Sequence, residues 1–142
     1  IKTKDGARLL QGIPSHLPAL QKAHRIGEKA SRVGFDWAEG EEEAVLDKVA
    51  EELREFRRAT SQEERLDEFG DLLFAVANVA RRMGIDPEEA LQRSNSRFIR
   101  RFAHVEDRLA EQGKKPGDAG LKEMDVYWEE AKKIERESGD RG

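Results

Sequence analysis

The sequence predicts an all-α fold of about five helices, and three observations lead to it. The 142 residues include only four prolines and one tyrosine, and no run of alternating Val, Ile and Thr is typical of a β-strand. Apolar residues recur with the period of an amphipathic helix. Capping residues, glycines and prolines stand where these segments begin and end. A chain of this length is enough for one domain with its own core.

The predicted helices follow one another with short connections. We expect them at residues 15–32, 41–59, about 61–83, 87–112 and 121–137. Ser15 is the predicted N-cap of the first helix, with Pro18 in its first turn. Asp86 is the predicted N-cap of the fourth helix, with Pro87 at the first helical position.

The third helix has signals at both ends. Thr60 or Ser61 is its predicted N-cap, and Glu63 or Glu64 stands where a capping box needs an acid. Gly84 marks its end. Around the helical domain of residues 14–137, we expect a linker or arm at 1–13 and a frayed tail at 138–142.

The composition excludes several classes of protein. Charged residues make up 39% of the chain, but acids and bases nearly balance at a net charge of −4, which disfavours direct binding of nucleic acid. The lack of cysteine excludes disulfides, a thiolate nucleophile and Cys-ligated zinc. No signal peptide and no apolar run of roughly 20 residues is visible, so no membrane span is expected and the predicted location is the cytoplasm.

Two acids of the second predicted helix lie near its apolar side. That side is formed by Val45, Val49, Leu53 and Phe56. On a wheel of 100° per residue, Glu52 falls at the margin of this stripe. Glu55 follows one turn later, and Lys48 is a nearby candidate cation for phosphate.

The third predicted helix is unusually apolar. Between residues 69 and 80 only Asp71 and Asn78 have polar side chains, which predicts burial nearly all round. Asp71 and Asn78 are seven residues apart and share a face, and Glu68 lies one turn before Asp71. An ionised carboxylate in such a place costs several kcal/mol unless it is paired or bound to a metal.

These acids are predicted to converge. Twelve residues separate the pair Glu52 and Glu55 from the pair Glu68 and Asp71, and the turn between them lets the two helices run antiparallel. Clustered carboxylates favour a hard cation such as Mg²⁺ or Mn²⁺. Two alternatives remain open: a solvated helix face, and a buried salt bridge to arginine.

The fourth predicted helix carries candidate phosphate ligands. Asn95 lies inside its apolar stripe and is expected to be buried with hydrogen-bond partners. Arg97 and Arg101 flank the stripe and suit a polyphosphate, although surface ion pairing explains them equally well. In the last helix, Trp128 is either core or a stacking face for a base.

Other catalytic arrangements are missing from the sequence. The three histidines, His16, His24 and His104, form no Glu-x-x-His pair, which argues against a di-iron centre. Neither a Gly-rich phosphate loop nor a Ser-His-Asp arrangement is present.

Taken together, these motifs resemble the catalytic domain of the MazG nucleoside triphosphate pyrophosphohydrolases, which belong to the all-α NTP pyrophosphatase superfamily. The resemblance extends from about Leu9 to Ile134. It includes the segments "GIPSHLPAL", "EKASRVGFDW", "KVAEELREF", "DEFGDLLFAVANVAR", "ALQRSNSRFIRRFAHVE" and "MDVYWEEAK". The opening segment resembles the joint between the two halves of MazG proteins, which suggests a C-terminal half or a trimmed chain.

The resemblance implies roles for individual residues. Those implied to ligate Mg²⁺, with Mn²⁺ as a substitute, are Glu52, Glu55, Glu68 and Asp71. Asn95, Arg97 and Arg101 would contact the phosphates or organise their surroundings, and Trp128 would lie near the nucleoside. Arg97 departs from the lysine that is common at this position in the family.

The implied reaction converts a nucleoside triphosphate and water to a nucleoside monophosphate and pyrophosphate. Glu52 or Glu55 is the expected general base, and the resemblance also implies an antiparallel helical bundle that dimerises through its helices. The alternative is a non-catalytic helical module that binds nucleotides or another protein.

Overall fold

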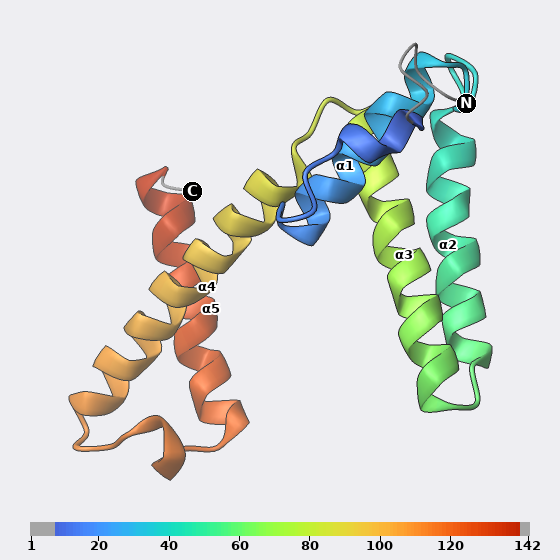
Figure 1. The fold of residues 1–142 in the computed structure, drawn as a ribbon. Coiled ribbons are helices and arrows are strands. Elements are labelled where there is room, and N and C mark those ends of the chain that lie inside the picture. Colours follow the sequence, from blue (N-terminus) through green and yellow to red (C-terminus); the bar gives the residue numbers. More distant parts are fainter. Residues whose placement is uncertain (1–7, 140–142) are drawn as a thin grey trace. The chain divides into compact units, whose positions relative to one another are not determined.

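The structure is a computed structural model that describes residues 8–139, and this part of the chain contains five α-helices and no strand (Figure 1). The helices are α1 (Ala19–Arg32), α2 (Glu42–Arg58), α3 (Gln62–Arg82), α4 (Pro87–Ala110) and α5 (Leu121–Ser138). Two short 3-10 helices, η1 (Leu9–Gly12) and η2 (Pro116–Asp118), precede α1 and α5. The predicted all-α class is confirmed.

The chain forms two compact units, the first extending to Glu89 and the second beginning at Ala90. None of the helices in residues 8–139 has the length and apolar character that crossing a bilayer requires. Residues 1–7 of the predicted arm and 140–142 of the predicted tail lie outside the described residues. Within the arm, Leu9–Gly12 form η1 and the side chain of Ile13 is buried.

The start of α1 differs from the prediction. The helix begins at Ala19 with Pro18 as its N-cap, so Ser15 is not the capping residue. Pro18 adopts an extended backbone conformation (φ −53°, ψ 142°), and its carbonyl accepts the first helical hydrogen bond from the N–H of Lys22 at 2.8 Å. Proline lacks an N–H, so the helix starts directly after it.

The starts of α3 and α4 confirm the predicted caps. The hydroxyl of Ser61 accepts a hydrogen bond from the backbone N–H of Glu64 at 3.1 Å, and the Glu64 carboxylate accepts one from the N–H of Thr60 at 3.2 Å. The carboxylate of Asp86 accepts from the N–H groups of Glu88 and Glu89. These side chains satisfy donors that have no partner inside the helix.

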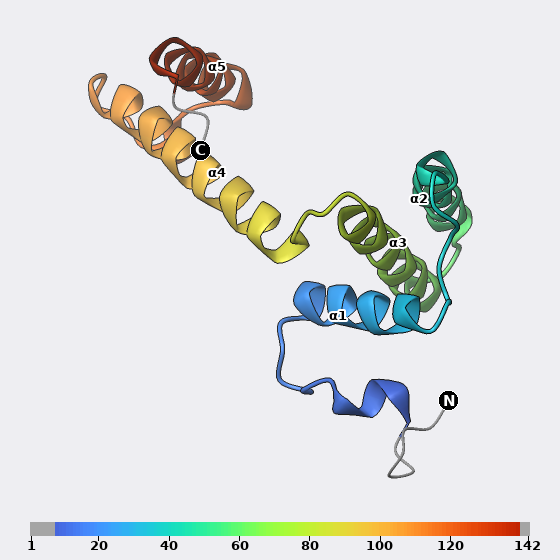
Figure 2. The same cartoon turned by 90° about the horizontal axis from the view of Figure 1, so that it is seen from above.

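In the first unit, α2 and α3 run antiparallel beside each other, joined by a short turn (Figure 1). Phe56 and Phe69 meet edge to face across this hairpin, with ring centroids 5.3 Å apart. The third helix of the unit, α1, packs against α3 and lies between η1 and α3 (Figure 2). Ala77 and Ala80 are buried on α3, and their small side chains allow the neighbouring helices to approach closely.

The prediction that residues 69–80 of α3 are buried nearly all round is wrong, and the exposed apolar face extends beyond them to Leu66. Leu66 is 71% exposed and Phe69 is 45% exposed, and Leu73 and Val76 are also exposed. These four positions follow the helical spacing of one face. The reason is that α1 and α2 together cover only part of the circumference of α3, which leaves this apolar face on the surface of the unit.

The second unit has its core between α4 and α5. Val105, Leu109 and Tyr127 are buried there, and Met124 and Trp128 pack against them. The expected burial of Asn95 is wrong, because Asn95 is exposed, as is Phe98 one turn later. The residues that α4 buries in this core, Val105 and Leu109, lie in its C-terminal half, so the stripe that contains Asn95 is not covered within the unit.

Candidate metal centre and phosphate-binding residues

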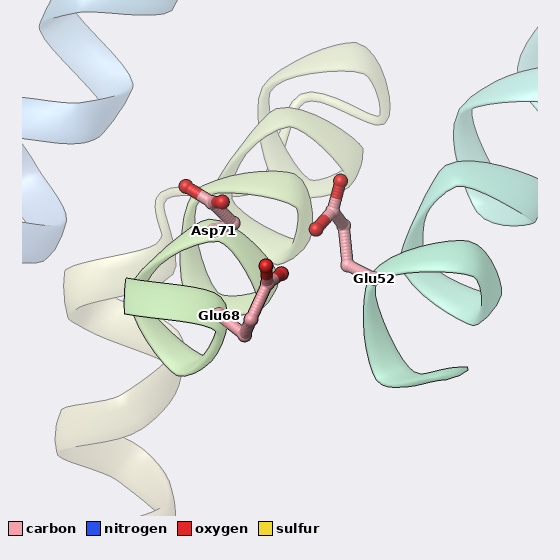
Figure 3. Close-up of side chains that lie close together, drawn as sticks. All are labelled: Glu52, Glu68 and Asp71. Atoms are coloured by element: carbon pink, nitrogen blue, oxygen red, sulfur yellow. The ribbon is translucent and has the colours of Figure 1, made fainter. Parts of the chain in front are cut away.

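Three carboxylates from two helices converge in the first unit. Glu52 projects from α2 toward Glu68 and Asp71 on α3, and one oxygen of each lies within 4.8 Å of the others (Figure 3). Glu68 and Asp71 are one helical turn apart and therefore share a face. The antiparallel hairpin brings Glu52 opposite that face, as the sequence predicted.

The surroundings of Glu68 disfavour the ionised form of its carboxylate. Its pKa is raised, first by desolvation and then by the negative charges of Asp71, Glu52 and Glu55. Nearby like charges disfavour the ionised form of a carboxylate. A cation placed among these oxygens would offset the repulsion between the neighbouring carboxylates.

The side chain of Glu52 is only 12% exposed. Its carboxylate forms an ion pair with Lys48, at 3.1 Å from the Nζ atom. The pKa of Lys48 is raised mainly by this hydrogen bond. Lys48 therefore acts within the chain as a counter-ion for Glu52, and the predicted contact between Lys48 and phosphate stays a prediction.

Glu55 lies outside the group of three converging acids. Its carboxylate accepts a hydrogen bond from Arg58 at 3.0 Å, and its side chain is 44% exposed. It is still close enough to contribute to the raised pKa of Glu68. The structure thus brings three of the four predicted metal ligands together and places the fourth beside them.

The donor set fits a hard divalent cation. Every converging ligand atom is a carboxylate oxygen, which is the ligand type that Mg²⁺ and Mn²⁺ prefer. Within residues 8–139, no arginine forms an ion pair with Glu52, Glu68 or Asp71; the cation paired with Glu52 is a lysine. The alternative of a buried salt bridge to arginine therefore does not explain how these three acids are held.

A cavity of about 470 Å³ lies in the same unit, between α1, α3 and the connection after α1. Its walls include Ile26, Phe35, Trp37 and Phe74, and Asn78 and Arg81 supply polar groups. Two features of the sequence point to this cavity: the aromatic connection after the first helix, and the face that Asn78 shares with Asp71. The cavity was not predicted from them, because the contact between α1 and α3 is long-range.

In the second unit, Arg101 is held between an acid and an aromatic ring. Its Nε atom donates to Glu135 at 2.6 Å, and its guanidinium carbon lies 5.7 Å from the centre of the Trp128 ring. Trp128 also packs against Phe98, with ring centroids 4.8 Å apart. Trp128 therefore belongs partly to the core and partly to the surroundings of Arg101.

A second cavity, of about 270 Å³, is lined mainly by basic side chains of this unit. It is lined by Arg97, Arg101, Lys132, Glu135 and Arg136. Lys132 and Arg136 were not identified from the sequence, although both follow Trp128 on α5 at helical spacing. Of the predicted ligands, Arg97 and Arg101 line one cavity, and Asn95 is exposed on α4.

The chain is similar to known proteins over most of its length. Residues 23–97, just over half of the chain, match the model of the family described as phosphoribosyl-ATP pyrophosphohydrolase. The chain is 41% identical over 116 residues to the nucleoside triphosphate pyrophosphohydrolase/pyrophosphatase MazG of Thermotoga maritima, covering 82% of this chain and 45% of that protein.

Two further relatives cover nearly the whole chain. It is 39% identical over 145 residues to a nucleoside triphosphate pyrophosphohydrolase of Escherichia coli, covering 95% of this chain and 54% of that protein. It is 44% identical over 139 residues to the uncharacterized protein YabN of Bacillus subtilis, covering 96% of this chain and 28% of that protein. The chain thus spans about half the length, or less, of these relatives.

These matches cover the helices that carry Glu52, Glu68 and Asp71. The chain therefore belongs to the phosphoribosyl-ATP pyrophosphohydrolase family of helical domains and has MazG nucleoside triphosphate pyrophosphohydrolases among its relatives.

Proposed function

We propose that this chain hydrolyses nucleoside triphosphates, or their deoxy forms, to the monophosphate and pyrophosphate. The observation that carries the proposal is the convergence of Glu52, Glu68 and Asp71, with oxygens within 4.8 Å of one another. Relatives at 39–41% identity are named for this reaction. The cellular role that suits such a reaction is the removal of unwanted nucleotides from the pool.

The three converging acids are the proposed ligands of Mg²⁺, for which Mn²⁺ can substitute. Glu55 would complete the set by exchanging its contact with Arg58 for one with the ion. When bound, the ion supplies positive charge next to the triphosphate. Lys48 keeps part of the charge of Glu52 neutralised, which limits the repulsion that substrate phosphates would otherwise meet.

The general base is proposed to be Glu52 or Glu55, and their surroundings differ. Glu52 is nearly buried, belongs to the converging set and is paired with Lys48. Glu55 is half-exposed and lies outside that set. In one arrangement Glu55 keeps its contact with Arg58 and leaves the ion to the other three acids. Its half-exposed carboxylate then reaches water and is the better placed of the two to accept a proton, so we favour Glu55 there.

The basic residues of the second unit are the proposed phosphate ligands. Arg97 and Arg101 line one cavity and can form charge-assisted bonds to phosphate oxygens. Asn95 and Lys48 are proposed as further contacts. For the nucleoside, the resemblance favours Trp128, whereas the cavity beside Trp37 offers a second aromatic wall in the unit that holds the acids.

We further propose that residues 14–137 act as one catalytic domain in the cytoplasm, where nucleotide pools lie, and that the chain forms a homodimer. The exposed apolar face of α3, which contains Leu66, Phe69, Leu73 and Val76, supports an interface between helices. Leu66→Glu should then convert the dimer to a monomer in sedimentation velocity. A wild-type chain that sediments as a monomer at micromolar concentration would contradict the dimer.

The proposed reaction is tested by incubating the chain with the common NTPs and dNTPs and measuring pyrophosphate release with and without Mg²⁺. Pyrophosphate release that requires the ion is the expected result. Nucleotide binding without any product would instead support the alternative, a non-catalytic helical module. Release of orthophosphate in place of pyrophosphate would contradict the proposed bond cleavage.

A further inference from the structure

The connection between α1 and α2 is fastened to the C-terminal end of α3 by an ion pair. Asp36 lies in this connection and accepts two hydrogen bonds from Arg81, one to each carboxylate oxygen, both at 2.9 Å. Arg82 approaches the same carboxylate at 3.4 Å. The two parallel bonds from one guanidinium fix the orientation of the carboxylate as well as its distance. We call Asp36, Arg81 and Arg82 the Asp36 clamp.

Arg82 also holds the backbone of the connection. Arg82 donates to the carbonyl of Trp37 at 2.9 Å and to the carbonyl of Ala38 at 2.8 Å. The N–H of Trp37 donates back to the Asp36 carboxylate at 2.9 Å. The peptide groups on both sides of Trp37 are therefore fixed, and the position of its ring follows from them.

The clamp is largely shielded from water. The side chains of Arg81 and Arg82 are each 11% exposed, and that of Asp36 is 16% exposed. The first helix closes over it at Gly27, where an added Cβ would lie 2.8 Å from the Nε atom of Arg81. Removing one partner of such a shielded pair leaves the other charge uncompensated, so its loss is felt strongly.

The clamp lies at one end of a row of functional groups on α3. Asp71 and Asn78 share a face of this helix, and Arg81 follows one turn after Asn78. The rise of a helix puts Arg81 about 15 Å beyond Asp71. The cavity of about 470 Å³ opens between them, with Phe35 and Trp37 of the clamped connection in its wall.

From this arrangement we infer that Asp36 is a positioning residue for nucleotide binding: it holds the aromatic wall of the cavity in place, beside the acids that receive the phosphate end. The inference rests on the proposed function. Asp36 makes no contact with the reacting atoms in this account. Its effect passes through Trp37, so it acts on affinity for the nucleoside end and leaves the acidic end unchanged.

The test uses the full chain with Asp36→Asn, which keeps the shape of the side chain and removes its charge. Asp47→Asn is the matched control, because Asp47 is an exposed acid on α2 outside the clamp. Arg82→Lys is a second variant that keeps the charge but removes the forked geometry, in case Asp36→Asn does not fold. Calorimetry measures binding of Mn²⁺ alone, of inorganic pyrophosphate, and of the α,β-methylene analogues of ATP and UTP.

Asp36→Asn should weaken binding of the analogues about tenfold or more, with binding of Mn²⁺ and pyrophosphate unchanged. In proton–nitrogen NMR spectra, the indole signal of Trp37 should move while that of Trp128 stays. Arg82→Lys should show the same pattern more weakly, and Asp47→Asn should match the wild type.

Three results separate the inference from the proposed function. Wild-type affinity for the analogues in both clamp variants overturns the inference alone, and so does an equal loss of Mn²⁺ and analogue binding, which indicates general destabilisation. A wild-type chain that binds the analogues but releases no pyrophosphate overturns the proposed reaction and leaves the clamp standing. A wild-type chain that binds neither analogue overturns both.

Discussion

The two units of the chain differ in how their charged side chains are arranged. In the first unit, Glu52, Glu68 and Asp71 bring like charges together, and Glu52 forms an ion pair with Lys48. In the second unit, Arg101 has a carboxylate at 2.6 Å and an aromatic ring beneath its guanidinium. Like charges that fold together cost free energy, whereas opposite charges that pair support the fold.

This difference separates candidate function from structural support. The first unit does not lack arginines for its acids, because it pairs Asp36 with two of them. A shortage of basic partners therefore does not explain why its three converging carboxylates lie together, and this is the contrast on which the proposed cation site depends. In the second unit, by contrast, the hydrogen bond to Glu135 fixes the orientation of the Arg101 guanidinium before any ligand binds.

The largest expected effect comes from the acids. Asp71→Asn should lower the rate of pyrophosphate release at saturating Mg²⁺ by about 10²–10³-fold, the typical effect of removing one preorganised electrostatic group. Because Asp71 is exposed, the circular dichroism spectrum and the unfolding midpoint should change little. Asp47→Asn is the control of equal charge. Full activity in Asp71→Asn would contradict a functional role for the converging acids of the first unit.

The next effect concerns the second unit. Arg101→Ala should raise KM for the nucleotide by roughly 10-fold or more, since a charge-assisted bond to phosphate contributes about 1.5–3 kcal/mol. Glu135→Gln should change KM less, because it leaves the guanidinium in place and removes only its orienting partner. The control is Lys133→Ala, which removes an exposed cation from α5, the helix that carries Glu135. Equal effects of Arg101→Ala and Lys133→Ala on KM would show that only net charge matters.

A smaller effect is expected from pH. Hydrogen bonding with Arg81 lowers the pKa of Asp36 from 3.8 to about 2. A lowered pKa means that the stabilisation is complete above the unfolded-state value and is lost as the pH falls from about 4 through 2. The shift from 3.8 to about 2 corresponds to no more than about 2.5 kcal/mol. Urea unfolding between pH 2 and 6 should show this slope in the wild type and a reduced slope in Asp36→Asn.

The smallest effect should come from relieving the repulsion itself. Without divalent ions, Glu68→Gln should unfold at a slightly higher temperature than the wild type, because desolvation and then the neighbouring acids raise the pKa of Glu68 and so disfavour its charged form. Adding Mg²⁺ should then stabilise the wild type more than the variant. Differential scanning calorimetry of both proteins with and without Mg²⁺ measures this. A variant that gains as much as the wild type would remove Glu68 from the ligand set.

The features that depend on neighbours in the sequence were predictable. The caps at Ser61 and Asp86 use side chains two to three residues from their donors, and the convergence of Glu52 with Glu68 follows from one short turn. Partner choice was harder even at short range. Glu55 turns to Arg58 because the two lie on one helical face, and the sequence offers several acids and bases at that spacing.

Features that depend on tertiary packing were not predictable. The exposure of Leu66 is set by how much of α3 the other helices cover, which helical periodicity does not contain. The pair of Asp36 with Arg81 joins residues 45 positions apart, and nothing local distinguishes Arg81 from the other arginines. The cavity beside Trp37 depends on the same long-range contact and was missed with it.

The lack of a side chain at Gly27 shows how closely α1 and α3 pack in the first unit. Alanine at this position would favour the helical conformation by about 1 kcal/mol, yet its methyl group would meet the side chain of Arg81. An unrestrained arginine would swing aside, but this one is pinned by Asp36. A larger side chain at Gly27 would therefore displace Arg81 or move α1 away from α3, and because Gly27 also lines the cavity, either change would alter the cavity wall.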